Sequence, residues 1–489
     1  MPNRWPIASG NWSNAAIWSG SLIPTAADDV FANNFTVNID TSFEVLTLRN
    51  TASASVIVAG GSFNFNSGRI SGSVTSATPL NAGATNLITV TATTGSVGLT
   101  LGGSATATIA GNLINHTGNC NFNLNGLNFT AGASGQICIN KTSTGTITIV
   151  GNIFGNGSVG INSTNGNTVI TGNVTAGPTN FAIFQTAGNI TVTGNVAGSA
   201  GGGTIVGIGL SGANSILTVT GNVTGGGAGS AHGISLTGAS SLFTINGNVT
   251  GGNAASAFGI NFTGTSGTVN GNVVGGPTAA AINTTAPTFV VGNISGSATN
   301  GIITTAPVVV TGSVIATGAV PAISNASAIF MNISGSVIAS SLANAISLTN
   351  ASAVVNLAGN IVNVNGKQAI YCQNLFLDNT ATTQARFFTF GGSDRTLYSS
   401  DTFSNLPSAS NVRFGTTYGP GSGNTGTLRM ASPQDVRSGV LTDNTTGSAI
   451  LSMESLSNEI QTSSDPFAQR LRNISTVDVV GNLLTAFKK

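Results

Sequence analysis

The sequence predicts an all-β protein, a parallel β-solenoid (β-helix), and three observations lead to that fold class. Two short phrases recur in step along the middle of the chain. No charged residue occurs from Thr142 through Gly366, and 67 glycines separate short apolar runs in a chain of 489 residues. Ordinary domains are about a quarter charged, whereas this chain is 6% charged. Such a sequence is expected to be built by repetition.

The first phrase is a run of β-forming residues followed by Gly-Asn-Val or a close variant, as in Ile190–Val196. Apolar and polar residues alternate in it, which is typical of strands with one face inward. Glycine permits positive φ at a corner, and asparagine tolerates the left-handed region and forms ladders between like neighbours. The glycines of its ten copies are spaced 20 to 27 residues apart: Gly151, Gly172, Gly194, Gly221, Gly247, Gly271, Gly292, Gly312, Gly335 and Gly359.

The second phrase is a small residue followed by isoleucine, and it interleaves with the first. Each repeat therefore holds two or three short strands, which are too short to be stable alone. Stacked coil on coil, each strand pairs with its own copies and the inward side chains form one column. The ten isoleucines are Ile161, Ile183, Ile208, Ile234, Ile260, Ile282, Ile302, Ile323, Ile346 and Ile370.

The absence of charge fits this stacking. Equivalent residues of adjacent coils lie about 4.8 Å apart, so a charge present in every repeat would face its own copies. Ten coils at that rise give a rod of roughly 50 Å. The same composition also fits a disordered low-complexity chain. The period shared by both phrases and the 40% hydrophobic content favour the solenoid.

We expect three regions. Residues 1–44 form an N-terminal cap or anchor, because all three tryptophans, Trp5, Trp12 and Trp18, lie there and a solenoid must cover its open end. Docking of a partner or a sugar is the alternative role of this cluster. Residues 45–377 form the solenoid, with a looser pattern up to residue 150.

Residues 378–489 form a small mixed β and short-helix module for assembly. Nine of the thirteen acidic residues lie there, and 385–390 reads as a strand. Asp465 fits a helix N-cap and Pro466 the first helical position. The helix and the tail that follows it are too small to bury a core alone. The expected assembly residues are Asp465, Pro466, Phe467, Leu471, Leu483, Leu484 and Phe487.

Candidate catalytic residues are few before residue 378. Asp28 and Asp29 are adjacent and point to opposite faces of a strand, so we expect a turn or cap role rather than a carboxylate pair. His116 and His232 have no acid near them in sequence, and we expect polar or packing roles. The three cysteines, Cys120, Cys138 and Cys372, are scattered, and we expect reduced core residues.

Cofactor and metal sites are not expected. Residues 207–212 spell G-x-G-x-x-G, but this is one phase of the repeat and no acid follows about 20 residues on. Calcium-binding solenoid repeats need an Asp in every turn. The acids after residue 378 are expected to serve turns and ion pairs with nearby arginines: Asp394, Asp401, Asp435 and Asp443 with Arg395, Arg413 and Arg437.

Net charge and the length of apolar runs exclude further classes of protein. A net charge of +1 gives no footprint for nucleic acid. No run of 18 apolar residues is present, so we expect no membrane insertion. The first residues contain no apolar run typical of a signal peptide. This favours a protein assembled in a host cytoplasm over an exported bacterial adhesin.

Three segments carry a resemblance to tailed-bacteriophage virion proteins, the fibre and tailspike-like β-helical proteins. Residues 425–451, with Ser432–Val440 at their centre, resemble a module of such proteins. Residues 468–478 are similar to their ends. Residues 10–30 resemble the first coil of phage and bacterial surface β-helices. The resemblance implies a homotrimer, and it is silent on the receptor.

Together these observations predict a structural, non-enzymatic virion fibre that contributes to host-surface attachment. Its expected partners are two further copies of itself, other virion proteins of head or tail, and a glycan or protein receptor on the host. A polysaccharide depolymerase of the tailspike type is the first alternative. It would need paired Asp or Glu residues, which residues 45–377 do not contain. A bacterial surface adhesin is the second.

Overall fold

A computed structural model describes residues 2–53, 57–83, 85–107, 112–131, 137–156, 159–201, 205–325, 327–339, 345–350 and 353–357. Beyond these it describes the strands at 361–363, 370–371, 374–377, 386–390, 393–397, 417–418, 424–425, 441–442 and 445–446. The chain divides into two compact units, Met1–Arg395 and Thr396–Lys489. In the second unit β48 (Thr417–Tyr418) pairs antiparallel with β49 (Asn424–Thr425), and β50 (Leu441–Thr442) with β51 (Thr445–Thr446).

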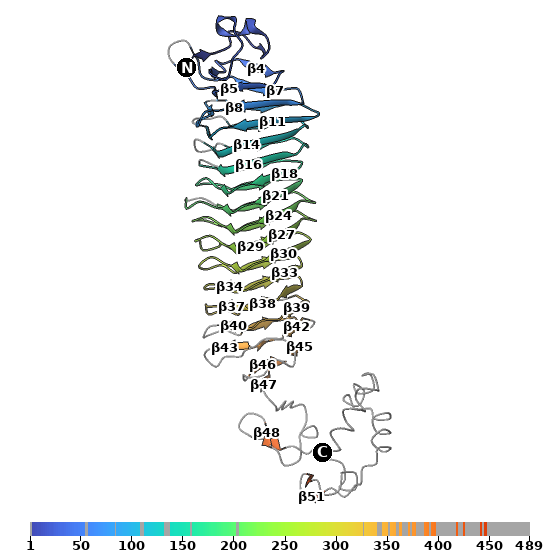
Figure 1. The fold of residues 1–489 in the computed structure, drawn as a ribbon. Helices are drawn as coiled ribbons and strands as arrows, with labels where there is room; N and C mark the ends of the chain where they lie inside the picture. The colour runs from blue at the N-terminus through green and yellow to red at the C-terminus, as the bar shows by residue number, and fades with distance from the viewer. Residues whose placement is uncertain are drawn as a thin grey trace, which may run out of the picture. The chain divides into compact units, whose positions relative to one another are not determined.

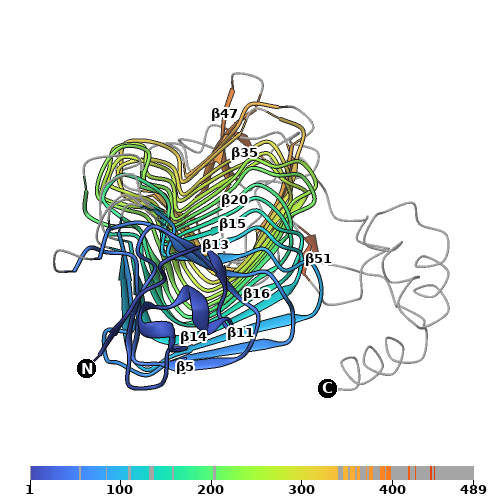
Figure 2. The same cartoon turned by 90° about the horizontal axis from the view of Figure 1, so that it is seen from above.

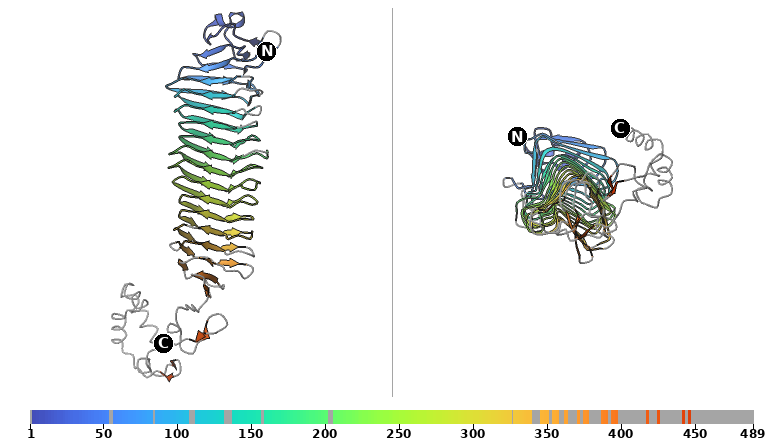
Figure 3. Two further views of the ribbon diagram at one scale, coloured as in Figure 1. Left: turned by 180° about the vertical axis from the view of Figure 1, so that it is seen from behind. Right: turned by 90° about the horizontal axis from the view of Figure 1, so that it is seen from below.

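The first unit is a parallel β-solenoid of about 14 turns, which confirms the predicted fold class (Figure 1). A turn runs through three short strands, here called first, second and third, such as β17 (Ile161–Ser163), β18 (Thr168–Thr171) and β19 (Val174–Thr175). Each pairs in parallel with its copies in the turns before and after. Seen along the axis, the turns superpose (Figure 2), and the view from behind shows the same stack (Figure 3).

The first strands form one sheet. In order they are β2 (Gly10–Asn11), β4 (Thr36–Ile39), β7 (Ser62–Phe65), β10 (Ile88–Val90), β13 (Ile114–His116), β15 (Ile139–Lys141), β17, β20 (Ile183–Gln185), β23 (Ile208–Leu210), β26 (Ile234–Leu236), β29 (Ile260–Phe262), β32 (Ile282–Thr284), β35 (Ile302–Thr304), β38 (Ile323–Asn325), β41 (Ile346–Leu348), β44 (Ile370–Tyr371), β46 (Arg386–Phe390) and β47 (Ser393–Leu397).

The second and third strands share a second sheet, because β14 (Asn121–Thr130) and β16 (Ile147–Phe154) run through the corner between them. The other second strands are β5 (Phe43–Val45), β8 (Ile70–Val74), β11 (Ser96–Leu101), β18, β21 (Asn189–Thr193), β24 (Ile216–Thr220), β27 (Leu242–Asn246), β30 (Ser266–Asn270), β33 (Thr288–Val291), β36 (Val308–Val310), β39 (Phe330–Ile333), β42 (Val354–Leu357) and β45 (Asn374–Leu377).

The third strands complete each turn. They are β1 (Asn3–Arg4), β3 (Asp29–Phe31), β6 (Thr47–Arg49), β9 (Leu80–Ala82), β12 (Ser104–Ala107), β19, β22 (Val196–Ala197), β25 (Val223–Thr224), β28 (Val249–Thr250), β31 (Val273–Val274), β34 (Ile294–Gly296), β37 (Val314–Ala316), β40 (Val337–Ala339) and β43 (Ile361–Asn363). Two 3-10 helices, η1 (Ala15–Ile17) and η2 (Ser19–Ser21), precede β3.

The isoleucines of the second phrase stack in register, as predicted. Ile161 pairs with Ile183, Ile183 with Ile208, and so on down to Ile346 with Ile370. The column also extends upstream through Ile139 and Ile114. Inward side chains from Trp12 to Leu357 form one continuous cluster. Full burial of each such aliphatic side chain stabilises the fold by about 1.5–3 kcal/mol.

The phrase glycines stack at the corner between second and third strands. At Gly172 the backbone has φ +145°, and a Cβ there would lie 2.2 Å from the carbonyl oxygen of Gly151. The same approach to the glycine of the preceding turn recurs at Gly194, Gly221 and Gly247. A side chain at these positions is excluded both by the conformation and by the backbone of the neighbouring coil.

The asparagines beside these glycines form the predicted ladder. The Oδ1 of Asn173 accepts a hydrogen bond from the backbone N–H of Asn195 at 2.8 Å, and Asn195 accepts from Asn222 at 2.9 Å. The ladder runs on through Asn248, Asn272 and Asn293 to Ser313, whose hydroxyl accepts from Ser336. One amide per turn therefore joins each coil to the next.

Both sheets of the solenoid begin within the predicted cap region. In residues 1–44, β1 and β2 already pair with β3 and β4, so both sheets continue into the predicted cap region. Near the other end β46 confirms the strand predicted over 385–390. The expected helix and assembly residues from Asp465 to Phe487 lie outside the described residues.

Candidate functional site

The tryptophans predicted to cap the solenoid lie at its first turn. Trp12 and Trp18 are fully buried, their ring centroids 5.0 Å apart in an edge-on arrangement. Trp12 also stacks on Phe43 at 4.7 Å, and Trp18 Nε1 donates to the Trp12 carbonyl at 2.9 Å. Trp5 is half-buried, and its carbonyl accepts from Ser19 N–H. Burial of two rings favours capping over the sugar-docking alternative, because a docking platform needs exposed faces.

Asp28 and Asp29 serve local structure, as predicted. The buried Asp28 carboxylate accepts from the backbone N–H of Thr25 at 2.7 Å and from its hydroxyl at 2.9 Å, and it lies 3.5 Å from Arg4 Nε. Asp29 instead accepts from the Thr47 hydroxyl at 2.6 Å. Asp28 thus closes a turn while Asp29 ties β3 to β6.

The G-x-G-x-x-G segment at 207–212 spans β23 of the regular stack. A Cβ on Gly207 would lie 2.6 Å from the Gly233 carbonyl oxygen, and one on Gly212 would lie 1.2 Å from that of Thr186. These glycines therefore pack against the backbone of adjacent coils. They leave no open cradle for a phosphate group.

A column of buried polar side chains runs inside the rod. The third residue of each first strand points inward, and four consecutive copies of this position are polar and fully buried: His116, Lys141, Ser163 and Gln185. Several members donate to the carbonyl two residues further on, which closes the corner after the strand. These bonds are Lys141 Nζ to Ser143 at 2.7 Å, Gln185 Nε2 to Ala187 at 2.7 Å, Thr284 Oγ1 to Ala286 at 2.8 Å and Thr304 Oγ1 to Ala306 at 2.8 Å.

Lys141 is the member of this column that the sequence analysis did not single out. Its Nζ donates to the carbonyls of Ser143 and Asn165. The chain has no acidic residue between Glu44 and Asp378, and no ion pair in the described ranges involves this ammonium. Burial lowers the pKa of Lys141 to about 8, since removal from water disfavours the charged form.

His116 lies one coil from Lys141. The hydroxyl of Ser143 is 3.2 Å from its Nδ1, and Cys120 Sγ is 3.9 Å from its Nε2. Burial, and then the charge of Lys141, lower the pKa of His116 to about 4, so the imidazole is neutral at neutral pH. Ser143 and His116 are both buried, and a substrate has no access to this pair.

The other histidine and the cysteines are also packing residues, as predicted. His232 Nδ1 accepts from the backbone N–H of Phe258 at 3.1 Å, and the two rings stack with centroids 5.2 Å apart. Burial lowers the pKa of His232 to about 4. Cys120 and Cys138 are free and buried, and burial raises the pKa of both thiols. Cys372 lies outside the described residues.

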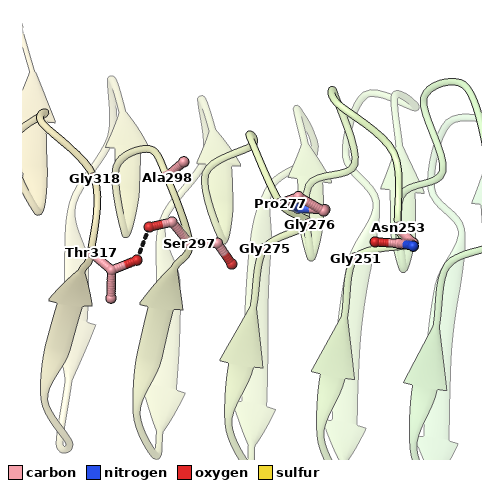
Figure 4. Close-up of a pocket in the computed structure, with 10 residues that line it drawn as sticks. Gly251, Asn253, Gly275, Gly276, Pro277, Ser297, Ala298, Thr317 and Gly318 are labelled. Atoms are coloured by element: carbon pink, nitrogen blue, oxygen red, sulfur yellow. Dashed lines mark hydrogen bonds between the residues drawn. The ribbon is translucent and has the colours of Figure 1, made fainter.

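A shallow groove of about 560 Å³ crosses four successive turns where the third strands end (Figure 4). Glycine pairs 251–252 and 275–276 line it, together with the polar residues Asn253, Ser297 and Thr317. The Thr317 hydroxyl donates to the Ser297 carbonyl, which ties two turns together. None of the lining side chains is titratable, so the groove offers shape and hydrogen bonds but no acid–base group.

The outward positions of the second strands change character along the rod. From β21 to β24 they carry threonine pairs, Thr191 with Thr193 and Thr218 with Thr220. From β33 to β39 exposed apolar side chains replace them: Phe289, Val291 and Phe330. These outward positions carry no charge, and they mix hydroxyl groups with apolar side chains, since Ile216 in β24 and Leu242 in β27 are exposed as well.

No group of three or more His, Cys, Asp or Glu side chains in the described ranges lies close enough together to hold a metal ion. Within the same ranges, no helix has the length and apolarity needed to cross a membrane.

Comparison with known proteins adds no assignment. No protein-family model matches this chain, and no curated protein or solved structure matches it at a significant level. The residues and the geometry of this chain are therefore the basis for assigning its function.

Proposed function

We propose that this chain is a structural, non-enzymatic fibre protein of a tailed-bacteriophage virion that contributes to host-surface attachment. The observation that carries the proposal is the long solenoid, which has no charged residue from Thr142 through Gly366 and is closed at its first turn by buried tryptophans. Such a stack is rigid because every strand pairs on both sides. The resemblance of residues 10–30, 425–451 and 468–478 to virion proteins supports the same assignment.

The distribution of carboxylates supports a non-enzymatic role over a polysaccharide depolymerase. Glycoside hydrolysis usually takes two carboxylates on either side of the scissile bond. Before Asp378 the chain has only Asp28, Asp29, Asp40 and Glu44. The first two are held in the turn and strand contacts described above, and Asp40 accepts from the backbone N–H of Ser13 at 3.0 Å. The groove at residues 251–318 has no acid with which to cleave a glycan.

The uncharged surface of the regular repeats favours attachment through uncharged contacts. The groove and the threonine-rich face present hydroxyls, amides and backbone groups, which suit an uncharged glycan or a polar protein surface. Long-range electrostatic steering is absent from such contacts. Binding to host cells should therefore change less than two-fold between low salt and about 0.5 M salt, where charged contacts would be screened.

We further propose a homotrimer assembled through the C-terminal segment. Asp465, Pro466, Phe467 and Leu471 fit a capped helix, and the apolar tail with Leu483, Leu484 and Phe487 needs burial that one copy alone does not supply. Truncation after Asn458 should yield monomer or aggregate while far-ultraviolet circular dichroism stays β-rich. Light scattering that finds an unchanged trimer would remove this segment from assembly.

The decisive experiment locates the protein. Antibody against residues 159–325 should label purified particles in electron micrographs, and free protein should compete with particles for adsorption to host cells. Label on the bacterial envelope but not on particles would favour the adhesin alternative. Release of reducing ends from host polysaccharide, lost in D28N or D29N, would favour the depolymerase.

A further inference from the structure

The core of the solenoid contains two stacked basic side chains. His116 in β13 and Lys141 in β15 are register partners in adjacent strands, and both side chains are fully buried. Adjacent strands lie about 4.8 Å apart, so a protonated imidazole here would lie directly beside an ammonium group. Lys141 keeps its charge balanced only by backbone carbonyls, those of Ser143 and Asn165.

Among the residues that the structure describes, no acid is close enough to compensate a second charge. The acid that is nearest in sequence, Glu44, lies in the turn of β4 and β5, three first-strand spacings from β13 along β7 and β10. That separation is at least about 14 Å along the axis, well beyond the roughly 4 Å of an ion-pair contact. The other titratable side chain in contact with the imidazole is Cys120, whose thiol is neutral because burial raises its pKa.

The core next to this pair is polar as well. Ser163 and Gln185 continue the column below Lys141, and Gln185 Oε1 has no hydrogen-bond partner although the residue is fully buried. Separation of coils here would expose polar groups that water can satisfy. Elsewhere the same column holds Leu210, Leu236 and Phe262, whose exposure costs more.

We propose that the stacked pair of His116 and Lys141 makes these coils an acid-sensitive joint, which opens when the imidazole gains a proton beside the uncompensated ammonium. The joint comprises residues 112–131 and 137–156, the coils of β13 to β16. In a chain exposed to an acidic compartment or medium, it would loosen while residues 260–325, which contain no titratable side chain, stay paired.

The sign of the effect follows from linkage. The pKa of His116 is lowered from 6.5 to about 4 in the folded state, so the unfolded chain binds the proton more tightly. The stability contributed by the neutral imidazole is complete above pH 6.5 and is lost as the pH falls towards 4. Protonation of Lys141 persists throughout this window, since its pKa is about 8.

Hydrogen exchange read by mass spectrometry tests the joint in the full chain. Between pH 7 and pH 4.5, after correction for the intrinsic rates, exchange in residues 112–131 and 137–156 should accelerate at least ten-fold. Residues 260–325, which contain no titratable side chain, should change less than two-fold. Acceleration confined to residues 2–53 would assign the acid response to the cap carboxylates and overturn the proposal.

Two variants and a matched control complete the test. H116Q should abolish most of the acceleration, because it removes the group that gains the proton. K141M should reduce the acceleration, because it removes the neighbouring charge but keeps the burial that also lowers the pKa of His116. H232Q is the control, since His232 is similarly buried but stacks on Phe258. It should leave exchange in residues 112–156 as in the parent. If H116Q does not fold at pH 7, K141M decides alone, and an undiminished acid response in K141M would refute the joint.

Discussion

The regular repeats from residue 159 to 325 and the coils before them, residues 3 to 156, share one three-strand turn but are stabilised by different means. In the earlier coils large single side chains fill the core: Trp12, Trp18, Phe63, Phe65, Phe122 and Phe129 are all fully buried. In the regular repeats small features stack instead: a glycine and an isoleucine in every turn, and an asparagine beside the glycine in every turn except that of Ser313.

The difference shows how repetition replaces individual contacts. Where each turn copies the last, backbone hydrogen bonds and the asparagine ladder join the turns. The free-energy cost of a substitution there depends on whether it interrupts a column of stacked residues. Where turns differ, stability resides in particular side chains and their partners. Substitutions in each region, with matched controls, should therefore break the solenoid in different ways.

The largest effect is expected in the glycine column. Gly221→Val places a Cβ 2.2 Å from the Gly194 carbonyl oxygen at a backbone φ of +145°, which side chains rarely tolerate. We expect little or no soluble folded protein, measured by expression yield and circular dichroism. Gly98→Ala is the control, because a Cβ there meets only Ser71 Oγ, at 3.7 Å. A soluble, cooperatively melting Gly221→Val protein would show that the column is not obligatory.

The next largest effect is expected at the cap. Trp12→Ala removes a fully buried ring that contacts Trp18, Phe43 and Phe63, and such truncations cost about 3–5 kcal/mol. Denaturant titration followed by circular dichroism measures the loss. Trp5→Ala should cost less, since Trp5 is only half-buried. Equal losses for the two variants would mean that burial of the ring does not determine the stability of this end.

Much of the fold was predictable, because period and register are properties of the sequence. The isoleucine column and the Gly-Asn corner follow from spacing alone, and the structure confirms both. The roles of His116 and Asp28 were also correctly restricted, since no acid lies near His116 in sequence and since Asp29 points to the opposite face of the strand from Asp28. These inferences required only local patterns and the geometry of a stack.

The polar column was not predicted, because the second phrase has copies upstream of Ile161 that were not included in it. Two such copies are Ile114-Asn-His116 and Ile139-Asn-Lys141. Alternation places the third residue of each copy inward with its isoleucine. Extension of the phrase upstream would have put Lys141 in the core. The groove depends on loop conformation, which composition does not determine.

A third prediction concerns the buried ammonium. Lys141→Met keeps the length of the side chain and removes a charge that no carboxylate compensates, so the free energy of unfolding at pH 7 should rise by about 1–3 kcal/mol. In the parent, the pKa of Lys141 is about 8 when folded against 10.5 for an exposed lysine. The parent should therefore gain stability between pH 8 and 10.5.

The difference between parent and K141M isolates this contribution, because the thiols titrate equally in both. Denaturant titrations at pH 7, 8.5 and 10 should show the advantage of K141M shrinking as pH rises. An advantage that stays constant with pH would assign the gain to packing rather than to the charge.

The smallest effect is expected in the asparagine ladder. Asn222 Oδ1 accepts from the backbone N–H of Asn248 at 2.9 Å, and its own N–H donates to Asn195. Asn222→Ala leaves one N–H without its acceptor and should cost about 1 kcal/mol. Asn222→Ser should recover part of that loss, because Ser313 fills the same position lower in the stack and its hydroxyl accepts from Ser336 at 3.1 Å. Thermal melts of the three proteins rank them. If the alanine and serine variants are equally destabilised, the ladder depends on the length of the asparagine side chain. Ser313 and Ser336 then mark a weaker contact between turns.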